Sequence, residues 1–458
     1  MSWAMLEKKF NFAARFLSAL AWAAPAFFAF PGASFADEPN YDEAKVPKYE
    51  LPDVLSLPGG GAPAGTALEW LCGVRPGLRE IFEGEIYGRV PPRPDKLDFK
   101  LLESGDAFGG KAIRKQIRIT AADAAGEISF DMLLYIPKDG GDAKKAGSPR
   151  VAEGDFFNGK NFPVILGLNF EGNHATCSDA NVIVKEFLRS NGKMSADGAS
   201  KRGKKSRRWP YELAISRGYA VATICYLEIY PDFKGDLAKR ASALKIFGEE
   251  IAASDCGSIP VWTWGISRAI DCLESLREID AKKIVLLGHS RLGKTSLFAG
   301  AMDERAAIVV TNNSGCMGSA LSRRKFGETL DIMCGPVGHW IKKSAHAYRG
   351  REEFMPVDQH QLMALVAPRP LYVASASEDL WADPKGELLS LVEASKVYAL
   401  FGASALPSME NFEIEKPFMG DVGYHLRRGK HDILEYDWSN FMDFADAHFN
   451  AAGGGKKN

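Results

Sequence analysis

The sequence has no excess of charge of either sign. Its 57 lysine and arginine residues almost balance its 58 aspartate and glutamate residues, so the formal net charge is −1 at pH 7. A protein that attracts nucleic acid or an anionic membrane through its overall field carries a clear positive excess. We therefore expect no nucleic-acid partner for this chain of 458 residues, whose apolar content of 46% is that of a globular protein.

The sequence also lacks the patterns of a metal site. No two of its seven cysteines form a C-x-x-C pair, and no cluster of histidine, cysteine and carboxylate residues has ligand spacing. An odd number of cysteines cannot pair completely in disulfides. Cys225 and Cys272 lie in apolar periodic segments, where a buried free thiol is the default interpretation. We predict no bound metal.

The apolar run near the N-terminus is too short to cross a membrane. It covers Phe16–Phe30 and is interrupted by Pro25, whereas a membrane span needs about 20 residues. Basic residues precede the run, and small residues follow it, ending at Ala36. Residues 1–36 are therefore predicted to be a secretory signal peptide that is cleaved near Ala36. The mature protein is then secreted or periplasmic, without membrane attachment.

Composition divides the rest of the chain into three parts. Residues 37–65 are rich in proline, glycine and alanine, which indicates an extended arm or linker. We predict that residues 66–450 form one domain and that residues 451–458 form a frayed tail. The strand candidates are 162–170, 219–226, 283–288, 306–311 and 370–375, and the helix candidates include 262–279, 295–304 and 437–449. Several strand candidates are continuous aliphatic runs, which is typical of strands covered on both faces in a parallel sheet. The sequence predicts an α/β fold with three αβα layers around a mostly parallel sheet.

Two segments interrupt this alternation and are predicted to be surface insertions. Residues 137–161 lack periodicity, and residues 190–208 end in a basic cluster. The cluster could contact an acidic polymer, but charge runs are common on solvated surfaces, which is the favoured interpretation.

The segment Lys283–Leu297, KIVLLGHSRLGKTSL, fits two incompatible motifs. As G-x-x-x-x-G-K-[ST], residues 288–295 form a P-loop that binds nucleotide phosphates. As a strand followed by G-x-S-x and a helix, the same residues place Ser290 on a nucleophile elbow. The first motif predicts a nucleotide-binding protein and the second predicts an acyl-transfer enzyme.

The downstream sequence favours the elbow. A hydrolytic elbow needs a serine, then an acid after a later strand, then a histidine near the C-terminus. Glu378, Asp379 and Asp383 follow a strand candidate, and His431 precedes the last helix candidate. No aliphatic strand ends in the aspartate that a P-loop enzyme uses to hold Mg²⁺. An exported protein also meets little ATP, so Ser290 is predicted to be a nucleophile with His431 as its base.

The elbow departs from the general motif and resembles that of one family. Leu292 stands where generic elbows have glycine, but residues 288–294, GHSRLGK, match the G-x-S-R-x-G-K elbow of the glucuronoyl esterases, carbohydrate esterase family 15. The chain most resembles the bacterial branch of this family. Further blocks that resemble it are 82–91, 208–223, 262–274, 312–328, 338–340, 356–387 and 423–432. The resemblance implies an α/β-hydrolase fold for residues 66–450.

The resemblance also implies residue roles. It implies that Ser290 is the nucleophile, that His431 is the base and that Arg291 stabilises the oxyanion. It also implies that Lys294 and Glu328 hydrogen-bond sugar hydroxyls and that Trp381 packs against the uronate ring. Family members carry the catalytic acid in either of two places. The first place is Asn313, an amide that cannot carry the charge, so the resemblance points to the second, Asp379, with Glu378 as the fallback. His289 replaces the cysteine of fungal members, so their disulfide is not expected.

Each of these residues has a purely structural alternative. His431 could be structural, Asp379 could cap a helix, Lys294 could be a helix-surface charge, and Trp381 could be a core aromatic. Three further histidines, His174, His360 and His339, are expected to have structural roles, although His339 could line the pocket.

The implied activity is hydrolysis of the ester between 4-O-methyl-glucuronic acid of glucuronoxylan and an alcohol such as those of lignin. The resemblance implies no metal and no organic cofactor, and a monomer is expected. An acetyl-xylan esterase or another carbohydrate esterase would share the Ser290–His431–Asp379 triad, and a non-catalytic xylan-binding protein would bind without turnover.

Overall fold

The computed structural model describes residues 38–138, 161–195, 198–248, 256–403, 406 and 412–453. The predicted signal peptide, most of the predicted insertion at 137–161 and the end of the predicted tail lie outside the described residues. The chain divides into two compact units. Unit 1 comprises Met1–Tyr87 and Thr311–Asp432, and unit 2 comprises Gly88–Val310 and Ile433–Asn458.

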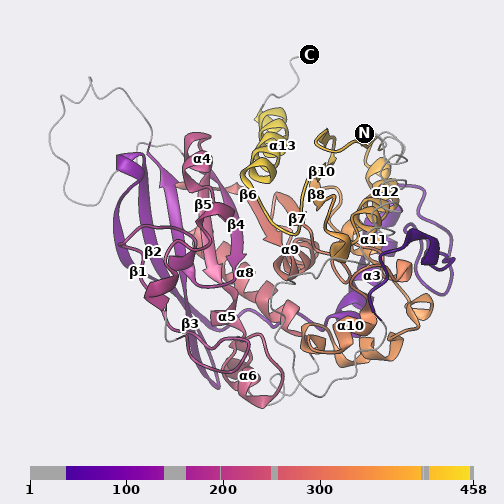
Figure 1. The fold of residues 1–458 in the computed structure, drawn as a ribbon, viewed down its shortest axis with the longest axis horizontal. Coiled ribbons are helices and arrows are strands. Elements are labelled where there is room, and N and C mark those ends of the chain that lie inside the picture. The colour runs from indigo at the N-terminus through magenta and orange to yellow at the C-terminus, as the bar shows by residue number, and fades with distance from the viewer. Residues whose placement is uncertain are drawn as a thin grey trace, which may run out of the picture. The chain divides into compact units, whose positions relative to one another are not determined.

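Strands and helices alternate along most of the described chain (Figure 1). The strands are β1 (Lys96–Ala107), β2 (Ala112–Asp123), β3 (Gly126–Pro137), β4 (Phe162–Asn169), β5 (Ala220–Cys225), β6 (Ile279–His289), β7 (Ile308–Asn312), β8 (Leu371–Ala376), β9 (Phe418–Met419) and β10 (Val422–Arg427). The α-helices are α2 (Ala67–Glu69), α3 (Arg75–Ile81), α4 (Tyr211–Ser216), α5 (Tyr226–Ile229), α6 (Asp236–Arg240), α8 (Ser258–Glu274), α9 (Arg291–Met302), α10 (Leu330–Cys334), α11 (Gln359–Ala364), α12 (Pro384–Leu400) and α13 (Glu435–Gly453). Among the described residues, none of the helices combines the length and apolar character needed to cross a bilayer.

The strands of unit 2 are hydrogen-bonded in the order β1-β2-β3-β5-β4-β6. β4 pairs in parallel with β5 and β6, whereas β1, β2, β3 and β5 are joined by antiparallel pairs. The strands predicted at 162–170, 219–226 and 283–288 are confirmed as β4, β5 and β6, and every residue of β5 is buried. The sequence patterns do not reveal β1, because its side chains are mostly exposed or half-buried and no apolar run marks it.

Close packing holds the helices of unit 2. Gly265 in α8 faces Ile229 of α5, where an added Cβ would lie 2.2 Å from Ile229 Cδ1, so only glycine allows this approach. The hydroxyl of Tyr219 donates to Asp446 of α13 at 2.6 Å, and Arg217, which directly follows α4, pairs with Asp443 at 2.8 Å. These contacts lay α13 beside α4.

In unit 1, β8 pairs in parallel with β10, and β10 pairs antiparallel with β9. The chain enters this unit within β7, and the backbone N–H of Asn313 donates to the carbonyl of Ala374 in β8 at 2.8 Å. The prediction of a strand at 370–375 is confirmed by β8. Asp383 caps the N-terminus of helix α12, because its carboxylate accepts from the N–H of Gly386 at 3.0 Å, and the helix begins at Pro384.

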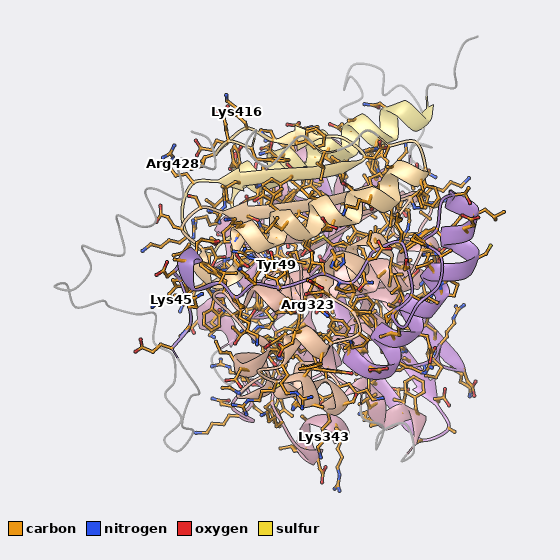
Figure 2. The ribbon with its side chains drawn as sticks, turned by 90° about the vertical axis from the view of Figure 1, so that its right-hand side faces the viewer. Lys45, Tyr49, Arg323, Lys343, Lys416 and Arg428 are labelled. Carbon is orange, nitrogen blue, oxygen red and sulfur yellow. The ribbon has the colours of Figure 1, made fainter. Side chains whose placement is uncertain are left out.

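The predicted arm is part of unit 1, and Figure 2 labels two of its residues, Lys45 and Tyr49. Apart from a single 3₁₀ turn at Glu43–Lys45, residues 38–65 have no regular structure. The carbonyl of Pro52 lies 2.8 Å from Nε2 of His360, which is fully buried, and burial lowers the pKa of this histidine. This contact supports the structural role expected for His360.

Lys201 and Lys205 of the basic cluster each lie 3.0 Å from a carboxylate oxygen of Glu171, so these two charges are paired within unit 2.

All seven cysteines are free, and Cys225 and Cys272 are fully buried, as predicted. Within the described ranges, no group of three or more His, Cys, Asp or Glu side chains could hold a metal ion.

Candidate active site

Ser290 occupies a one-residue turn between a strand and a helix. β6 ends at His289 and α9 begins at Arg291, while Ser290 itself has φ 59° and ψ −131°. A positive φ is strained for serine and is the backbone signature of a nucleophile elbow. The P-loop interpretation is wrong, because residues from 291 onward are already helical and leave no loop to surround a phosphate.

The close approach at this elbow falls on Gly288. A Cβ at Gly288 would lie 2.0 Å from the carbonyl oxygen of Leu292 and 2.6 Å from the hydroxyl of Ser296. The close contact between strand and helix therefore falls two residues before Ser290, and the position two residues after Ser290 accepts Leu292, which is buried. This explains how the chain tolerates leucine where generic elbows have glycine.

The guanidinium of Arg291 is held in place by its neighbours in unit 2. Its Nη1 donates to the buried carboxylate of Asp232, which also accepts from the hydroxyl of Tyr226 at 2.8 Å. Its Cζ lies 5.8 Å from the ring centroid of Phe170. Burial disfavours the charged form, but the negative charge of Asp232 outweighs it and raises the pKa of Arg291 above its usual value. Arg291 is thus a permanent, oriented positive charge directly after Ser290.

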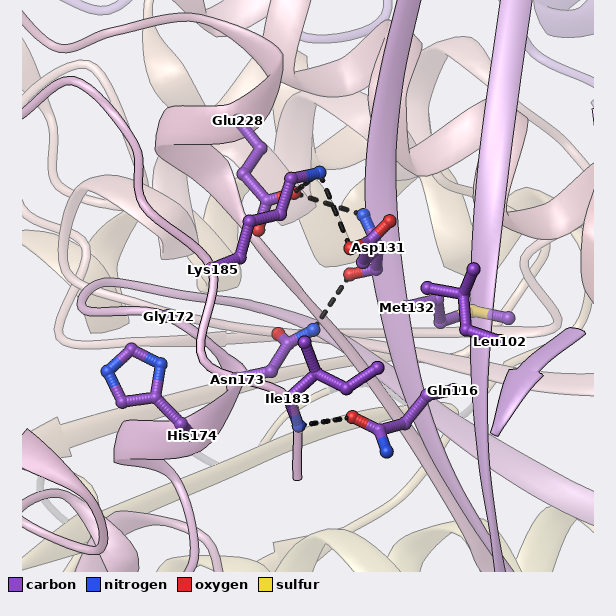
Figure 3. A pocket seen from close by; sticks show the side chains of 10 residues that line it. All are labelled: Leu102, Gln116, Asp131, Met132, Gly172, Asn173, His174, Ile183, Lys185 and Glu228. Carbon is purple, nitrogen blue, oxygen red and sulfur yellow. Dashed lines mark hydrogen bonds and ion pairs between the residues drawn. The ribbon is translucent and has the colours of Figure 1, made fainter. Parts of the chain in front are cut away.

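A small pocket is lined in part by Gly172, Asn173 and His174 of the loop that follows β4 (Figure 3). Its charged residues satisfy one another: Nζ of Lys185 lies 2.6 Å from Glu228 and 3.5 Å from Asp131. Asn173 donates from Nδ2 to the carbonyl of Asp131 at 2.8 Å. These contacts anchor the loop that begins at Phe170, so we assign the pocket a structural role.

The acid and the base predicted from the sequence are in direct contact in unit 1. Nδ1 of His431 lies 2.6 Å from Oδ2 of Asp379. Asp379 follows β8 and His431 follows β10, so both lie beyond the carboxyl ends of two paired parallel strands. Because a carboxylate only accepts, Nδ1 must donate, which leaves Nε2 as the imidazole acceptor that a general base needs.

The alternatives for the acid do not fit this geometry. The side chain of Glu378 is exposed, and the residue is held by a backbone hydrogen bond to Gly429. Asp379 precedes a 3₁₀ turn at Leu380–Ala382, but among the described residues its carboxylate caps no N–H of that turn. The helix-cap interpretation of Asp379 is therefore wrong.

Sequence reasoning did not identify the part played by Asn313. Its Nδ2 donates to Oδ2 of Asp379 at 2.6 Å, which is the same oxygen that accepts from His431. Asn313 follows β7 with φ 47°, a left-handed conformation that asparagine tolerates better than most residues. The amide that replaces one possible acid is thus a hydrogen-bond donor to the other.

Glu387 holds the loop that follows Asn313. Oε1 of this buried carboxyl accepts from the backbone N–H groups of Ser314 and Gly315 at 2.7 and 3.0 Å, and Oε2 accepts from Ser375 at 2.5 Å. Burial raises the pKa of Glu387 to about 7. Its position on α12 gives no local sign of this role, so only the folded structure reveals it.

The residues with implied sugar-binding roles lie in both units. Glu328 and Trp381 belong to unit 1, where the N–H of Glu328 donates to the carbonyl of Trp381 at 2.8 Å. Trp381 is only half-buried, so the core-aromatic alternative is wrong. Lys294 belongs to unit 2 and is 2% exposed, so the helix-surface alternative is also wrong.

Known proteins resemble the chain over most of its length. A family model described as glucuronyl esterase of fungi matches residues 211–402. Carbohydrate esterase MZ0003, from an unknown prokaryotic organism, is 40% identical over 418 residues, which cover 89% of this chain and 92% of that protein. The solved structure of a promiscuous esterase of carbohydrate esterase family 15, from a marine bacterial metagenome, has a TM-score of 0.78 at 38% identity and covers 90% of this chain and 100% of that one.

The chain belongs to carbohydrate esterase family 15. A glucuronoyl esterase from Solibacter usitatus, also with a TM-score of 0.78 at 38% identity, matches 89% of this family 15 chain and 100% of its own. The predicted α/β-hydrolase fold and the predicted class of enzyme, a carboxylic ester hydrolase, are confirmed by this membership. The roles of the individual site residues remain predictions.

Proposed function

We propose that this family 15 member hydrolyses the ester that joins 4-O-methyl-glucuronic acid of glucuronoxylan to an alcohol such as those of lignin. The name of its Solibacter relative, a glucuronoyl esterase, supports the acid part of this substrate. The observation that carries the proposal is the 2.6 Å contact between His431 and Asp379, in a chain whose Ser290 has elbow geometry.

In the proposed reaction, Oγ of Ser290 attacks the ester carbonyl while Nε2 of His431 takes the hydroxyl proton. The tetrahedral oxyanion is stabilised by the positive charge of Arg291. Collapse breaks the bond to the alkoxide, which leaves as the alcohol after receiving the proton from His431. A water molecule, deprotonated by His431, then hydrolyses the glucuronoyl ester of Ser290 and regenerates the enzyme.

Asp379 orients the imidazole and stabilises its charged form during turnover. Lys294 and Glu328 hydrogen-bond the sugar hydroxyls, and Trp381 packs against the uronate ring. No metal or organic cofactor is part of the proposed reaction.

The test compares Ser290→Ala with the wild type on benzyl glucuronate. We expect release of benzyl alcohol by the wild type and its loss in the variant, with an unchanged circular-dichroism spectrum. Turnover that survives in Ser290→Ala would refute the nucleophile assignment. If p-nitrophenyl acetate were cleaved far more efficiently than benzyl glucuronate, the enzyme would be an acetyl esterase on the same fold.

Three further predictions concern the protein outside its reaction. We propose export with cleavage near Ala36, a single catalytic domain at 66–450, and a monomeric state. N-terminal sequencing of the exported protein tests the cleavage site. Size-exclusion chromatography with light scattering tests the monomer, which a stable dimer at micromolar concentration would contradict.

A further inference from the structure

The N-terminal arm is hydrogen-bonded to a loop with an implied sugar-binding role. The N–H of Gly327 donates to the carbonyl of Asn40 at 2.8 Å, and the next residue, Glu328, donates to Trp381 at 2.8 Å. Gly327 has φ 62°, and a Cβ there would lie 2.3 Å from the carbonyl oxygen of Leu380. Backbone contacts therefore link the arm, through this loop, to the turn directly after Asp379.

Buried charges fix the arm in this position. The carboxylate of Glu43 lies 2.6 Å from Nη2 of Arg324 and 3.1 Å from Nζ of Lys385. Nε of Arg324 lies 2.8 Å from the carboxylate of Asp383, and the Arg324 and Asp383 side chains are 3% and 2% exposed. Desolvated charges of this kind are costly to leave unpaired, so the network resists detachment of the arm.

Tyr41 lies between these two anchors, with its ring partly in solvent. It is 43% exposed, whereas Phe326, whose ring meets it edge-on at 6.3 Å between centroids, is buried. Burial and the negative charge of Asp379 raise the pKa of Tyr41. The arm thus presents a partly exposed aromatic ring against Phe326, in the loop segment that continues directly into Gly327 and Glu328.

An aromatic face beside polar groups is well suited to a sugar. Carbohydrate rings have apolar C–H faces and polar edges, and a tyrosine ring offers apolar area at little entropic cost because few torsions must be fixed. We propose that Tyr41 is a specificity-determining residue that packs its ring against the carbohydrate side of the ester, the uronate or the xylose unit that bears it. This inference rests on the proposed function of the enzyme.

The test uses the mature full-length enzyme and three variants. Tyr41→Ala removes the ring, Tyr41→Phe keeps it, and Phe354→Ala removes a 62% exposed aromatic elsewhere in unit 1 as a matched control. Substrates are benzyl esters of glucuronic acid and of a glucuronoxylo-oligosaccharide, and the corresponding methyl esters. For Tyr41→Ala we expect KM to rise about tenfold with kcat within about twofold of wild type, as for a lost contact made equally in the ground and transition states. Tyr41→Phe and Phe354→Ala should match the wild type.

A fourth variant, Glu43→Gln, weakens an anchor of the arm and leaves the ring in place. It should raise KM in the same direction as Tyr41→Ala, by a smaller factor. Thermal melting curves of all variants show whether any effect on KM accompanies loss of folding.

Several results would overturn the inference while leaving the proposed function intact. One is wild-type KM in Tyr41→Ala. Others are a loss confined to benzyl esters, which would move Tyr41 to the alcohol side, and a fall in kcat alone, which would make it a positioning residue for Asp379. A wild-type enzyme that cleaves none of the glucuronate esters would instead refute the proposed function itself.

Discussion

Replacement of Asn313 tests how the acid–base pair is held. The amide donates to Oδ2 of Asp379 at 2.6 Å, and Asp379 is 3% exposed, so water cannot readily replace the lost donor. A hydrogen bond to a charged group contributes about 1.5–3 kcal/mol. Because each 1.36 kcal/mol is a factor of ten in rate, full expression of this loss in the transition state lowers kcat by about 10- to 100-fold.

Two substitutions separate the lost donor from backbone strain. Asn313 has φ 47°, which glycine adopts freely and alanine adopts at a cost of about 1–2 kcal/mol. Asn313→Gly and Asn313→Ala should therefore lose similar amounts of kcat, but only Asn313→Ala should carry the additional cost in the free energy of unfolding. KM should stay near the wild-type value in both, since Asn313 has no proposed contact with substrate.

The assay is steady-state hydrolysis of benzyl glucuronate together with urea denaturation of each variant. Wild-type kcat in Asn313→Gly would show that His431 alone orients Asp379, and the reasoning from this hydrogen bond would then be wrong. A rise in KM with unchanged kcat would indicate a contact with substrate instead.

Four other substitutions probe the site. Asp379→Asn should lower kcat by orders of magnitude, whereas Glu378→Gln, at an exposed side chain, should leave kcat near the wild-type value. If Glu378→Gln were instead the more damaging change, Glu378 would be the catalytic acid. Asp232→Asn should weaken the charge pairing that orients Arg291 and lower kcat about tenfold with KM little changed, and equal loss of stability and activity would indicate a merely structural role. Burial raises the pKa of Glu387 from 4.5 to about 7, so the folded state binds its proton more tightly than the unfolded state. Glu387 therefore contributes on the order of 3 kcal/mol to the free energy of unfolding below about pH 4.5, and this contribution is lost as the pH rises through about 7. Glu387→Gln should reduce the difference in the free energy of unfolding between pH 5 and pH 8, as measured by urea titration.

The sequence identifies the elements whose pattern is local. The aliphatic run at 283–288 and the G-x-S-R-x-G-K match predicted a strand, a turn at Ser290 and a helix, and the structure has β6 and α9 on either side of that residue. β1 escaped prediction because its side chains are mostly exposed or half-buried, and long antiparallel pairing with β2 holds it in place of an apolar run. β2 and β3 were also not predicted, although β2 alternates buried and half-buried residues and β3 contains the buried apolar run Met132–Ile136.

The sequence by itself determined which reactive groups are present and in what order: a serine on an elbow, an acid after a later strand, and a histidine near the C-terminus. The order of residues alone left Glu378, Asp379 and Asp383 open as the acid, and the family resemblance pointed to Asp379. Only the tertiary structure brings Asp379 into contact with His431 and Asn313, which lie 52 and 66 positions away from it in the chain. The tertiary structure also brings the arm into contact with Gly327 and Arg324. No local pattern predicts these contacts, because hydrogen bonds and buried ion pairs between distant residues depend on the folded backbone and not on the spacing of residues along the chain.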